Sequence, residues 1–535
     1  MKKMLHYKFN KGIVLCLIAA ITATGAYAQK KSDGQTKQKS DGQIKHYVPG
    51  EIASTVISHK EPERGSITIY GPYLPNVSSI RKHKCPEWFR DAKFGMFIDW
   101  GIYSVPGWAP KQEKEAMYPD GYLNHILHRE ADKAYHEKTW GKDFMPDDFI
   151  PMFTAENYDP QWLARLAKDA GMKYIIPFCK HHDGFCLWPS SYTGRNALQM
   201  GPHRDLIRPL VDACNRQELK FGFYFSVEEW RTLMIENGEK KVRVWNKPTE
   251  AWDGSQKQIR KMLSGKHFIE GNFFVDYIVP QAIEFINMYD PDILWFDGEW
   301  DYLMETQHTP DIISYFFNKA EGRKEVALND RNGQARHKIG DFFTSEYHSL
   351  TPEMKLTHPW EENRGISQSF GYNWQDTEEN VLTVEEFIHL FIRTVSENGN
   401  LLLIVNLDGK GGLPEVQERR LREIGKWLKI NGEAIYSTRP WLVSSENEGK
   451  IRYTQSKDGS AVYAICTEFP KDELKLKSIY IDSTSRITML GAEHDELEWE
   501  MRPGLWSERD LIISIPPSLK DKSKNEHAWV FKITL

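Results

Sequence analysis

The feature that most constrains the fold is an alternation of short apolar runs with longer amphipathic segments, from about residue 80 to residue 440. Buried parallel strands are continuous apolar runs, whereas surface helices repeat apolar residues every three or four positions. Helical repeats occur at 160–171, 382–398 and 415–431. This alternation predicts a parallel sheet covered by helices. The predicted strands are 93–99, 173–180, 220–226, 292–297, 326–330, 342–347 and 400–406.

The residues after these runs favour a closed barrel over an open sheet. No glycine-rich nucleotide-binding motif follows any of them. Instead they end in polar and charged residues, and an α/β barrel carries its active site at the carboxyl ends of its strands. We therefore expect a (β/α)8-type barrel over residues 51–440. The strand-end residues are Asp99, Lys180 to Asp183, Ser226, Asp297, Asn329 to Arg331, and Glu346.

The pattern changes after Trp441, where short strand-like segments are separated by turns. About 95 residues of this kind predict an antiparallel β-sandwich over residues 441–535. The predicted strands are 451–455, 460–467, 478–482, 487–490, 511–515 and 528–535.

The N-terminus has the pattern of a targeting segment. Four lysines precede an apolar stretch at 13–21, and Ala26-Tyr27-Ala28 forms a cleavage site. The apolar stretch is too short to span a bilayer. We expect a signal peptide at 1–28, a polar linker at 29–50, and secretion, to a bacterial periplasm. No membrane span is expected.

Composition excludes some partners. The chain has 75 acidic and 69 basic residues and a formal charge of −6, which gives no general support for nucleic-acid binding. Aromatic residues make up 13% of the 535 residues. They pack cores, but they also stack on the C–H faces of sugars.

Cys179 and Cys186 bracket two histidines, which raises the alternative of a zinc site. Cys179, however, lies in a predicted strand, where a small buried hydrophobe is the ordinary interpretation. We expect no metal and no cofactor.

Two strand ends carry candidate catalytic groups. Asp297 ends an apolar run between Trp295 and Trp300, an environment that suits a nucleophile attacking a sugar; the alternative is a helix N-cap. Glycosidic cleavage needs two carboxyl groups. His181 and His182 also follow a strand, where they can bind sugar hydroxyls; alternatively one is packed and the other solvated.

Several longer motifs resemble the family 29 glycoside hydrolases, the α-L-fucosidases. The resemblance covers about residues 80 to 441 and implies a barrel, a C-terminal β-sandwich, and a retaining mechanism without metal. The motifs are residues 88–108, Lys180-His-His-Asp-Gly-Phe-Cys-Leu-Trp-Pro189, Pro291-Asp-Ile-Leu-Trp-Phe-Asp-Gly-Glu-Trp300, Trp360-Glu361, Phe370-Gly-Tyr-Asn373, Asn398-Gly-Asn-Leu-Leu-Leu403 and Asn431-Gly-Glu-Ala-Ile-Tyr436.

The resemblance also implies residue roles. Asp297 is the nucleophile and Glu346 the acid/base, with Glu361 as the reserve candidate. In a retaining enzyme the two carboxyls lie about 5 to 5.5 Å apart and the acid has a raised pKa. The implied sugar-binding residues are Asp99, Trp100, Tyr118, His181, His182, Trp295 and Arg331.

The chain departs from the family pattern at two places. Asp99 stands where the family has a histidine, and Ala116-Met117-Tyr118 replaces Glu-Trp-Tyr, with Glu115 one residue away. An ionised carboxylate only accepts hydrogen bonds, whereas an imidazole also donates.

The expected activity is exo-acting hydrolysis of terminal α-L-fucosyl residues. The alternatives are an α-L-galactosidase or another L-sugar glycosidase on algal or plant polysaccharide, and a silent glycan-binding protein. The oligomeric state stays open.

Overall fold

The computed structural model describes residues 53–58, 66–111, 116–230, 233–236, 239–242, 268–270, 272–300, 302–334, 336–347, 349–504, 509–522 and 526–535. The predicted signal peptide and linker lie outside these residues. Within them, no helix has the length and apolar character needed to cross a membrane.

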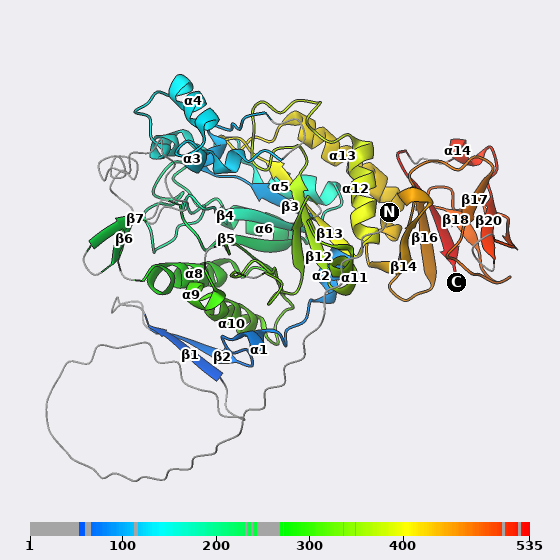
Figure 1. The fold of residues 1–535 in the computed structure, drawn as a ribbon, viewed down its shortest axis with the longest axis horizontal. Helices are drawn as coiled ribbons and strands as arrows, with labels where there is room; N and C mark the ends of the chain where they lie inside the picture. Colours follow the sequence, from blue (N-terminus) through cyan, green and yellow to red (C-terminus); the bar gives the residue numbers. More distant parts are fainter. Residues whose placement is uncertain are drawn as a thin grey trace, which may run out of the picture. The chain divides into compact units, whose positions relative to one another are not determined.

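Eight parallel strands form the central sheet, in the order β10-β9-β5-β4-β3-β13-β12-β11. Figure 1 labels β3, β4, β5, β12 and β13 of this sheet. An isolated parallel bridge from Asn329 to Phe342 joins the two outer strands and closes the barrel. The predicted barrel is thus confirmed. The strands are β3 (Phe94–Asp99), β4 (Tyr174–Lys180), β5 (Lys220–Ser226), β9 (Ile293–Asp297), β10 (Ala327–Leu328), β11 (Phe343–Glu346), β12 (Trp360–Gly365) and β13 (Gly399–Asn406).

Helices connect most of these strands, and their ends follow sequence signals. The first is capped by the Asp159 side chain, which accepts from the Trp162 N–H, and has Pro160 at its first position. Another begins at a capping box formed by Thr383 and Glu386. The longer connecting helices are α5 (Pro160–Asp169), α6 (Arg208–Arg216), α8 (Val279–Tyr289), α10 (Thr309–Ala320), α12 (Val384–Ser396) and α13 (Glu415–Asn431).

Side chains alternate between the barrel interior and the surrounding helices. On β9, Ile293 and Trp295 belong to the interior aromatic cluster, whereas Leu294 and Phe296 pack in the outer core. Because successive strand residues point to opposite faces, Asp297 at the end of β9 faces inward. The same alternation on β3 places Phe97 inside and turns Asp99, two residues later, to the same side.

Strand β12 is absent from the sequence prediction. Its segment, Trp360–Gly365, contains Glu361, Glu362 and Asn363, all fully buried, so it has no apolar run to detect. Strand β10 is also shorter than predicted, at two residues.

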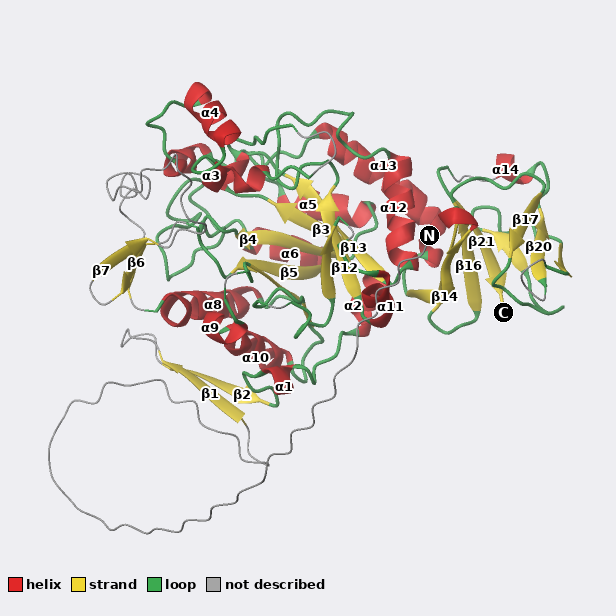
Figure 2. Cartoon of the chain, in the orientation of Figure 1, coloured by secondary structure: helices red, strands yellow, loops and turns green. Residues whose placement is uncertain are grey.

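The C-terminal region forms two antiparallel sheets, β14-β15-β16-β21-β18 and β17-β20-β19, drawn as strands and loops at the end of the chain in Figure 2. Their facing side chains share one apolar core, which confirms the sandwich. The predicted strand at 478–482 is wrong, because the strand lies earlier, at β17. The strands are β14 (Thr438–Glu446), β15 (Ile451–Ser456), β16 (Ala461–Cys466), β17 (Glu473–Leu476), β18 (Ile487–Met489), β19 (Trp499–Arg502), β20 (Asp510–Ser514) and β21 (Trp529–Thr534).

Specific contacts join the sandwich to helices α12 and α13. The Trp427 indole donates to the Ala528 carbonyl at 3.1 Å, and His389 Nε2 lies 2.8 Å from the His527 carbonyl. The smaller elements are β1 (Ala53–Ser58), β2 (Ser66–Gly71), α1 (Val77–Ile80), α2 (Glu87–Ala92), α3 (Tyr122–His125), α4 (Glu130–Thr139), β6 (Leu233–Glu236), β7 (Glu239–Val242), β8 (Phe268–Glu270), α9 (Met304–Gln307), α11 (Pro352–Thr357) and α14 (Leu519–Lys522).

Candidate active site

Asp297 is held at the end of β9 by four polar neighbours. Its Oδ2 accepts from the Tyr224 hydroxyl at 2.7 Å and lies 3.5 Å from Nε2 of His182. Its Oδ1 accepts from the Gly298 N–H at 3.0 Å and from Arg331 Nη1 at 3.2 Å. Burial alone would raise the pKa of Asp297, but the hydrogen bond with His182 and the charge of Arg331 lower it well below its usual range. The carboxylate is therefore ionised and aimed into the barrel.

Gly298 allows this arrangement. Its φ is +90°, and a Cβ at this position would lie 2.9 Å from the backbone nitrogen of Glu228. A larger residue would both strain the backbone and push β9 away from the segment that follows β5.

Glu346 lies at the end of β11 and shares Arg331 with Asp297. Arg331 donates through Nη2 to Glu346 and through Nη1 to Asp297. Its guanidinium is also fixed by the Thr344 hydroxyl, which accepts from Nε at 3.0 Å, and by the Trp295 ring 5.0 Å away. The Glu346 side chain is 29% exposed, whereas that of Asp297 is 11% exposed. The two carboxyls thus flank one cation, and Glu346 is the more open to solvent.

Glu361 lies deeper in the barrel. On β12 it pairs in register with Thr344, two residues before Glu346 on β11. It is fully buried, and accepts from the Tyr174 hydroxyl at 2.6 Å and from the Trp295 indole at 3.0 Å. Burial raises its pKa to about 7. We call Glu361, Tyr174 and Trp295 the barrel floor.

The two histidines lie beside Asp297 with different partners. His182 Nδ1 is 2.6 Å from the Ser226 hydroxyl, which itself donates to the Glu228 carbonyl. Nδ1 of His182 thus lies toward Ser226, and Nε2 faces Asp297. His181 stacks on Phe178, with ring centroids 5.5 Å apart, and its Nε2 lies 3.6 Å from Oδ2 of Asp120. We call Asp99, Asp120, His181, His182, Asp297, Arg331 and Glu346 the mouth cluster.

Comparison with known proteins shows which family this chain belongs to. Residues 63–433 match the family model for alpha-L-fucosidase, and residues 445–534 match the model for the alpha-L-fucosidase C-terminal domain. The chain belongs to the α-L-fucosidase family. It is accordingly a glycoside hydrolase.

Individual relatives are similar over almost their whole length. Human tissue alpha-L-fucosidase is 33% identical over 473 residues, which cover 86% of this chain and 92% of the human protein. The crystal structure of Thermotoga maritima alpha-fucosidase in complex with a mechanism-based inhibitor superposes with a TM-score of 0.70 at 32% identity, covering 86% of this chain and 100% of that one. The structure of the same enzyme in complex with fucose gives a TM-score of 0.69 at 32% identity, with the same coverage.

Asp99, the first departure from the fucosidase pattern, is fully buried at the mouth. Its Oδ1 accepts from the Tyr103 hydroxyl at 2.6 Å, so it is bonded to the loop that follows β3. Its Oδ2 has no hydrogen-bond partner among the described residues. Burial, followed by the charge of Asp120, raises the pKa of Asp99 well above its usual value.

The second departure lies in the loop around Met117. Glu115 lies outside the described residues, and the carboxylate that this loop brings to the mouth is Asp120. Sequence reasoning missed Asp120 because it follows no strand. It also missed Tyr224, which lies inside a predicted strand where an aromatic side chain indicates core packing.

Two predicted sugar-binding residues have different surroundings. Trp100 points away from Asp297: it packs on Phe153 and Tyr158, and its indole donates to the Asp408 carbonyl at 2.8 Å. Tyr118 is half-buried and stacks on Phe370, with ring centroids 5.6 Å apart. Its pKa is raised by burial and then by the charge of Glu346, which places it close to the mouth cluster.

The cysteines of the zinc alternative are buried in the outer core. Burial raises the pKa of both Cys179 and Cys186 well above the ordinary thiol value, which opposes the thiolate form that binds metals. No group of three or more potential metal ligands occurs in the described part of the chain.

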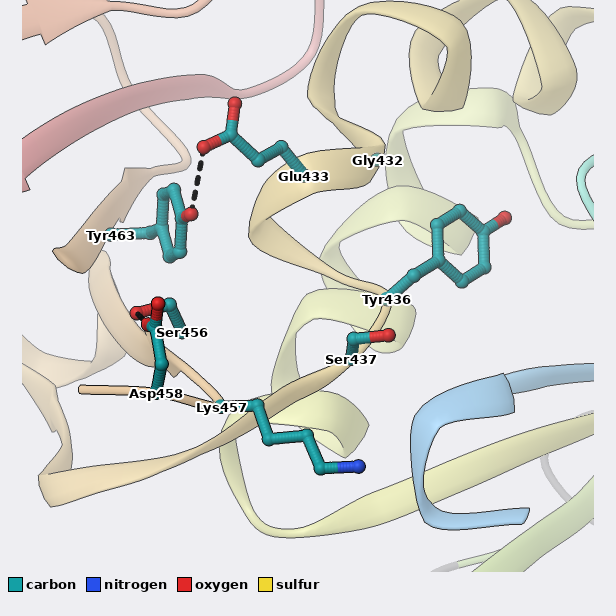
Figure 3. Close-up of a pocket in the computed structure, with 8 residues that line it drawn as sticks. All are labelled: Gly432, Glu433, Tyr436, Ser437, Ser456, Lys457, Asp458 and Tyr463. Atoms are coloured by element: carbon teal, nitrogen blue, oxygen red, sulfur yellow. Dashed lines mark hydrogen bonds between the residues drawn. The ribbon is translucent and has the colours of Figure 1, made fainter. Parts of the chain in front are cut away.

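A cavity of about 630 Å³ lies elsewhere, between the end of α13 and strands β15 and β16 (Figure 3). Its polar side chains are engaged with protein groups: the Tyr463 hydroxyl donates to Glu433 at 2.8 Å, and Lys457 pairs with Asp91 at 2.9 Å. These contacts join the barrel to the sandwich, and none of the strand-end residues lines this cavity.

Proposed function

We propose that this protein is a retaining α-L-fucosidase that removes terminal α-L-fucosyl residues from glycans. The observation that carries the proposal is the pairing of a buried, ionised Asp297 with a partly exposed Glu346 across one arginine. The names of the human and Thermotoga relatives support the same sugar.

In the first half-reaction, Asp297 attacks the anomeric carbon while Glu346 transfers its proton to the departing glycosidic oxygen. The bond to the aglycone breaks, and a covalent glycosyl-enzyme forms on Asp297. Arg331 orients both carboxyls. In the second half-reaction, Glu346 removes a proton from water, which attacks the same carbon and releases the sugar and a free Asp297.

Glu361 is the weaker candidate for the acid. Its raised pKa of about 7 suits a general acid, but both of its oxygens already accept from floor residues and the side chain is fully buried. A general acid must reach the leaving oxygen. We therefore assign the role to Glu346.

The decisive test is a panel of 4-nitrophenyl glycosides: α-L-fucoside, α-L-galactoside and β-D-galactoside. Turnover of the fucoside with little or none of the others is expected. Preferential turnover of the galactoside would favour the alternative α-L-galactosidase, for which the unpartnered Oδ2 of Asp99 is the supporting observation, since it can accept from an added hydroxyl. Absence of turnover on all three would contradict both.

We further propose that the chain is exported after removal of residues 1–28, with a linker at 29–50, a catalytic barrel at 51–440 and a β-sandwich at 441–535. Mass determination of the mature N-terminus checks the cleavage, which is expected before Gln29.

A further inference from the structure

Three neighbouring side chains of the mouth cluster each have a buried polar atom without a hydrogen-bond partner in the described part of the protein. These atoms are Oδ2 of Asp99, Oδ1 of Asp120 and Nδ1 of His181. The residues are 0%, 9% and 4% exposed. Buried polar groups are nearly always hydrogen-bonded, and leaving one unpaired costs about 1 to 3 kcal/mol. Three together therefore point to a polar ligand.

Asp120 lies beside His181, and Asp99 is linked to His181 through Tyr103. Asp120 Oδ2 is 3.6 Å from His181 Nε2. The His181 ring lies 5.1 Å from that of Tyr103, whose hydroxyl bonds Asp99. The charge of Asp120 is the strongest electrostatic influence on Asp99 after burial, and Asp297 also acts on both acids. The set thus adjoins the nucleophile.

The position of Asp120 is fixed by the surrounding backbone. It lies in the 3-10 turn Pro119–Gly121, just after Met117. The Met117 N–H donates to the Gln368 carbonyl at 2.9 Å, and its carbonyl accepts from the Phe370 N–H at 2.7 Å. Gly371 packs so closely that a Cβ there would lie 3.0 Å from the Asp120 nitrogen. The carboxyl is therefore held in place rather than left on a free loop.

We infer that Asp120, acting with Asp99 and His181, is a specificity-determining residue that binds a ring hydroxyl of the terminal sugar, and that the enzyme accepts only sugars whose hydroxyls are free at this edge. The inference rests on the proposed function. A sugar hydroxyl both donates and accepts, so hydroxyls can satisfy carboxyl oxygens and an imidazole nitrogen together.

The charges also indicate which sugars are excluded. Asp297 and Glu346 lie beside this edge, and Arg331 is already bound by both. A sulfate or carboxylate on the sugar at this edge would meet like charge without a free cation from Arg331. The substrate class is therefore an unsubstituted neutral pyranoside.

The test is a thermodynamic cycle that combines the Asp120→Ala substitution with the removal of single hydroxyls from the substrate. kcat and KM are measured on 4-nitrophenyl α-L-fucoside and on its 2-, 3- and 4-deoxy analogues. A site built to bind a hydroxyl discriminates strongly against an analogue that lacks it, so we expect a loss of about 100-fold or more for one analogue in the wild type. In Asp120→Ala the loss of kcat/KM caused by that same deoxy position should be at least about tenfold smaller than in the wild type. The losses on the other two analogues should stay unchanged.

Two further variants separate binding from folding. Asp120→Asn keeps the size of the side chain and should show the same coupling in weaker form if the alanine variant does not fold. Asp132→Asn is the matched control: Asp132 is 1% exposed and also has unpartnered oxygens, but the imidazole beside it is that of His125 at 3.8 Å, outside the mouth cluster. Asp132→Asn should leave the loss of kcat/KM on each deoxy analogue unchanged.

The outcomes distinguish the inference from the proposed function. If the enzyme turns over the parent fucoside but the effects of Asp120→Ala and of removing each sugar hydroxyl are simply additive, the inference is overturned and the proposed function stands. No turnover of the parent fucoside would overturn both. Placing sulfate on the hydroxyl that the cycle identifies should slow wild-type hydrolysis at least about 100-fold, and hydrolysis at the parent rate would also contradict the inference.

Discussion

Asp297 and Glu361 are carboxyl groups buried in the same barrel, yet their surroundings favour opposite charge states. Asp297 at the mouth has Arg331 and His182 beside it, and its pKa is lowered despite burial. Glu361 on the floor accepts from two neutral donors, Tyr174 and Trp295, and burial raises its pKa to about 7. Hydrogen bonds from neutral groups do not offset the loss of solvation here, whereas a fixed cation and an imidazole do. The groups around each buried carboxyl therefore decide which of the two is ionised.

The largest effect should come from removing the mouth carboxylate. Asp297→Ala is expected to lower kcat by about 10⁴-fold or more, because no covalent intermediate can form. Azide should restore part of the rate and give a glycosyl azide of inverted configuration, identified by NMR. Thermal unfolding close to that of the wild type would show that the fold survives. Wild-type-like turnover would end the assignment.

The second comparison is between the two glutamates. Glu346→Ala should slow a substrate with a poor leaving group by about 10² to 10⁴-fold, but slow a 2,4-dinitrophenyl glycoside much less, since an activated leaving group needs little protonation. Glu361→Gln should not show this dependence on the leaving group. The reverse result would move the acid/base role to the floor.

Removing the positive charge of Arg331 should bring the pKa of Asp297 closer to the raised pKa of Glu361. In Arg331→Gln the pKa of Asp297 is expected to rise, so the acid limb of the kcat/KM profile should move to higher pH, by about 1 to 3 units. Arg336→Gln is the matched control, because Arg336 lies 3.8 Å from Glu299 and 3.5 Å from Asp330 and makes no ion pair with Asp297. An unshifted limb in Arg331→Gln would show that Arg331 does not set the charge of the nucleophile.

Glu361 on the barrel floor should affect the pH dependence of the free energy of unfolding rather than the reaction rate. The folded pKa of Glu361 is raised to about 7, above the value of about 4.3 expected in the unfolded chain. Between these values the folded protein keeps a proton that the unfolded chain has released, so the wild type should lose stability as pH rises, at up to about 1.4 kcal/mol per pH unit from this group.

Glu361→Gln should remove that slope between about pH 4.3 and pH 7, measured by urea unfolding at several pH values. The exposed Glu325→Gln is the control and should leave the slope as in the wild type. The absolute stability of Glu361→Gln is expected to fall, since an amide nitrogen cannot accept from Tyr174 or Trp295. An unchanged slope would mean that Glu361 is already ionised.

Most of the barrel could be predicted because its strands are continuous apolar runs, and the strand ends include the two candidate carboxyls, Asp297 and Glu346. Strand β12 could not, because its inward side chains are polar. Trp100 differs from its neighbour in orientation: Asp99 faces the mouth, whereas alternation turns Trp100 outward. Asp120 was unpredictable for a different reason, since its place depends on pairing between Met117 and a segment about 250 residues away.

Asp99 gives the smallest expected effect and tests whether the contrast between mouth and floor is complete. Asp99 lies at the mouth, yet its Oδ1 accepts a hydrogen bond from a neutral donor, Tyr103, and its pKa is raised, as that of Glu361 is on the floor. Asp99→His would replace this acid by an imidazole that can donate to a sugar hydroxyl. We expect the ratio of kcat/KM on α-L-fucoside to that on α-L-galactoside to rise more than about threefold. Tyr103→Phe, which removes the donor but keeps the carboxyl, should change the ratio less. A ratio within threefold of the wild type in Asp99→His would mean that Asp99 supports the loop after β3 and does not select the sugar.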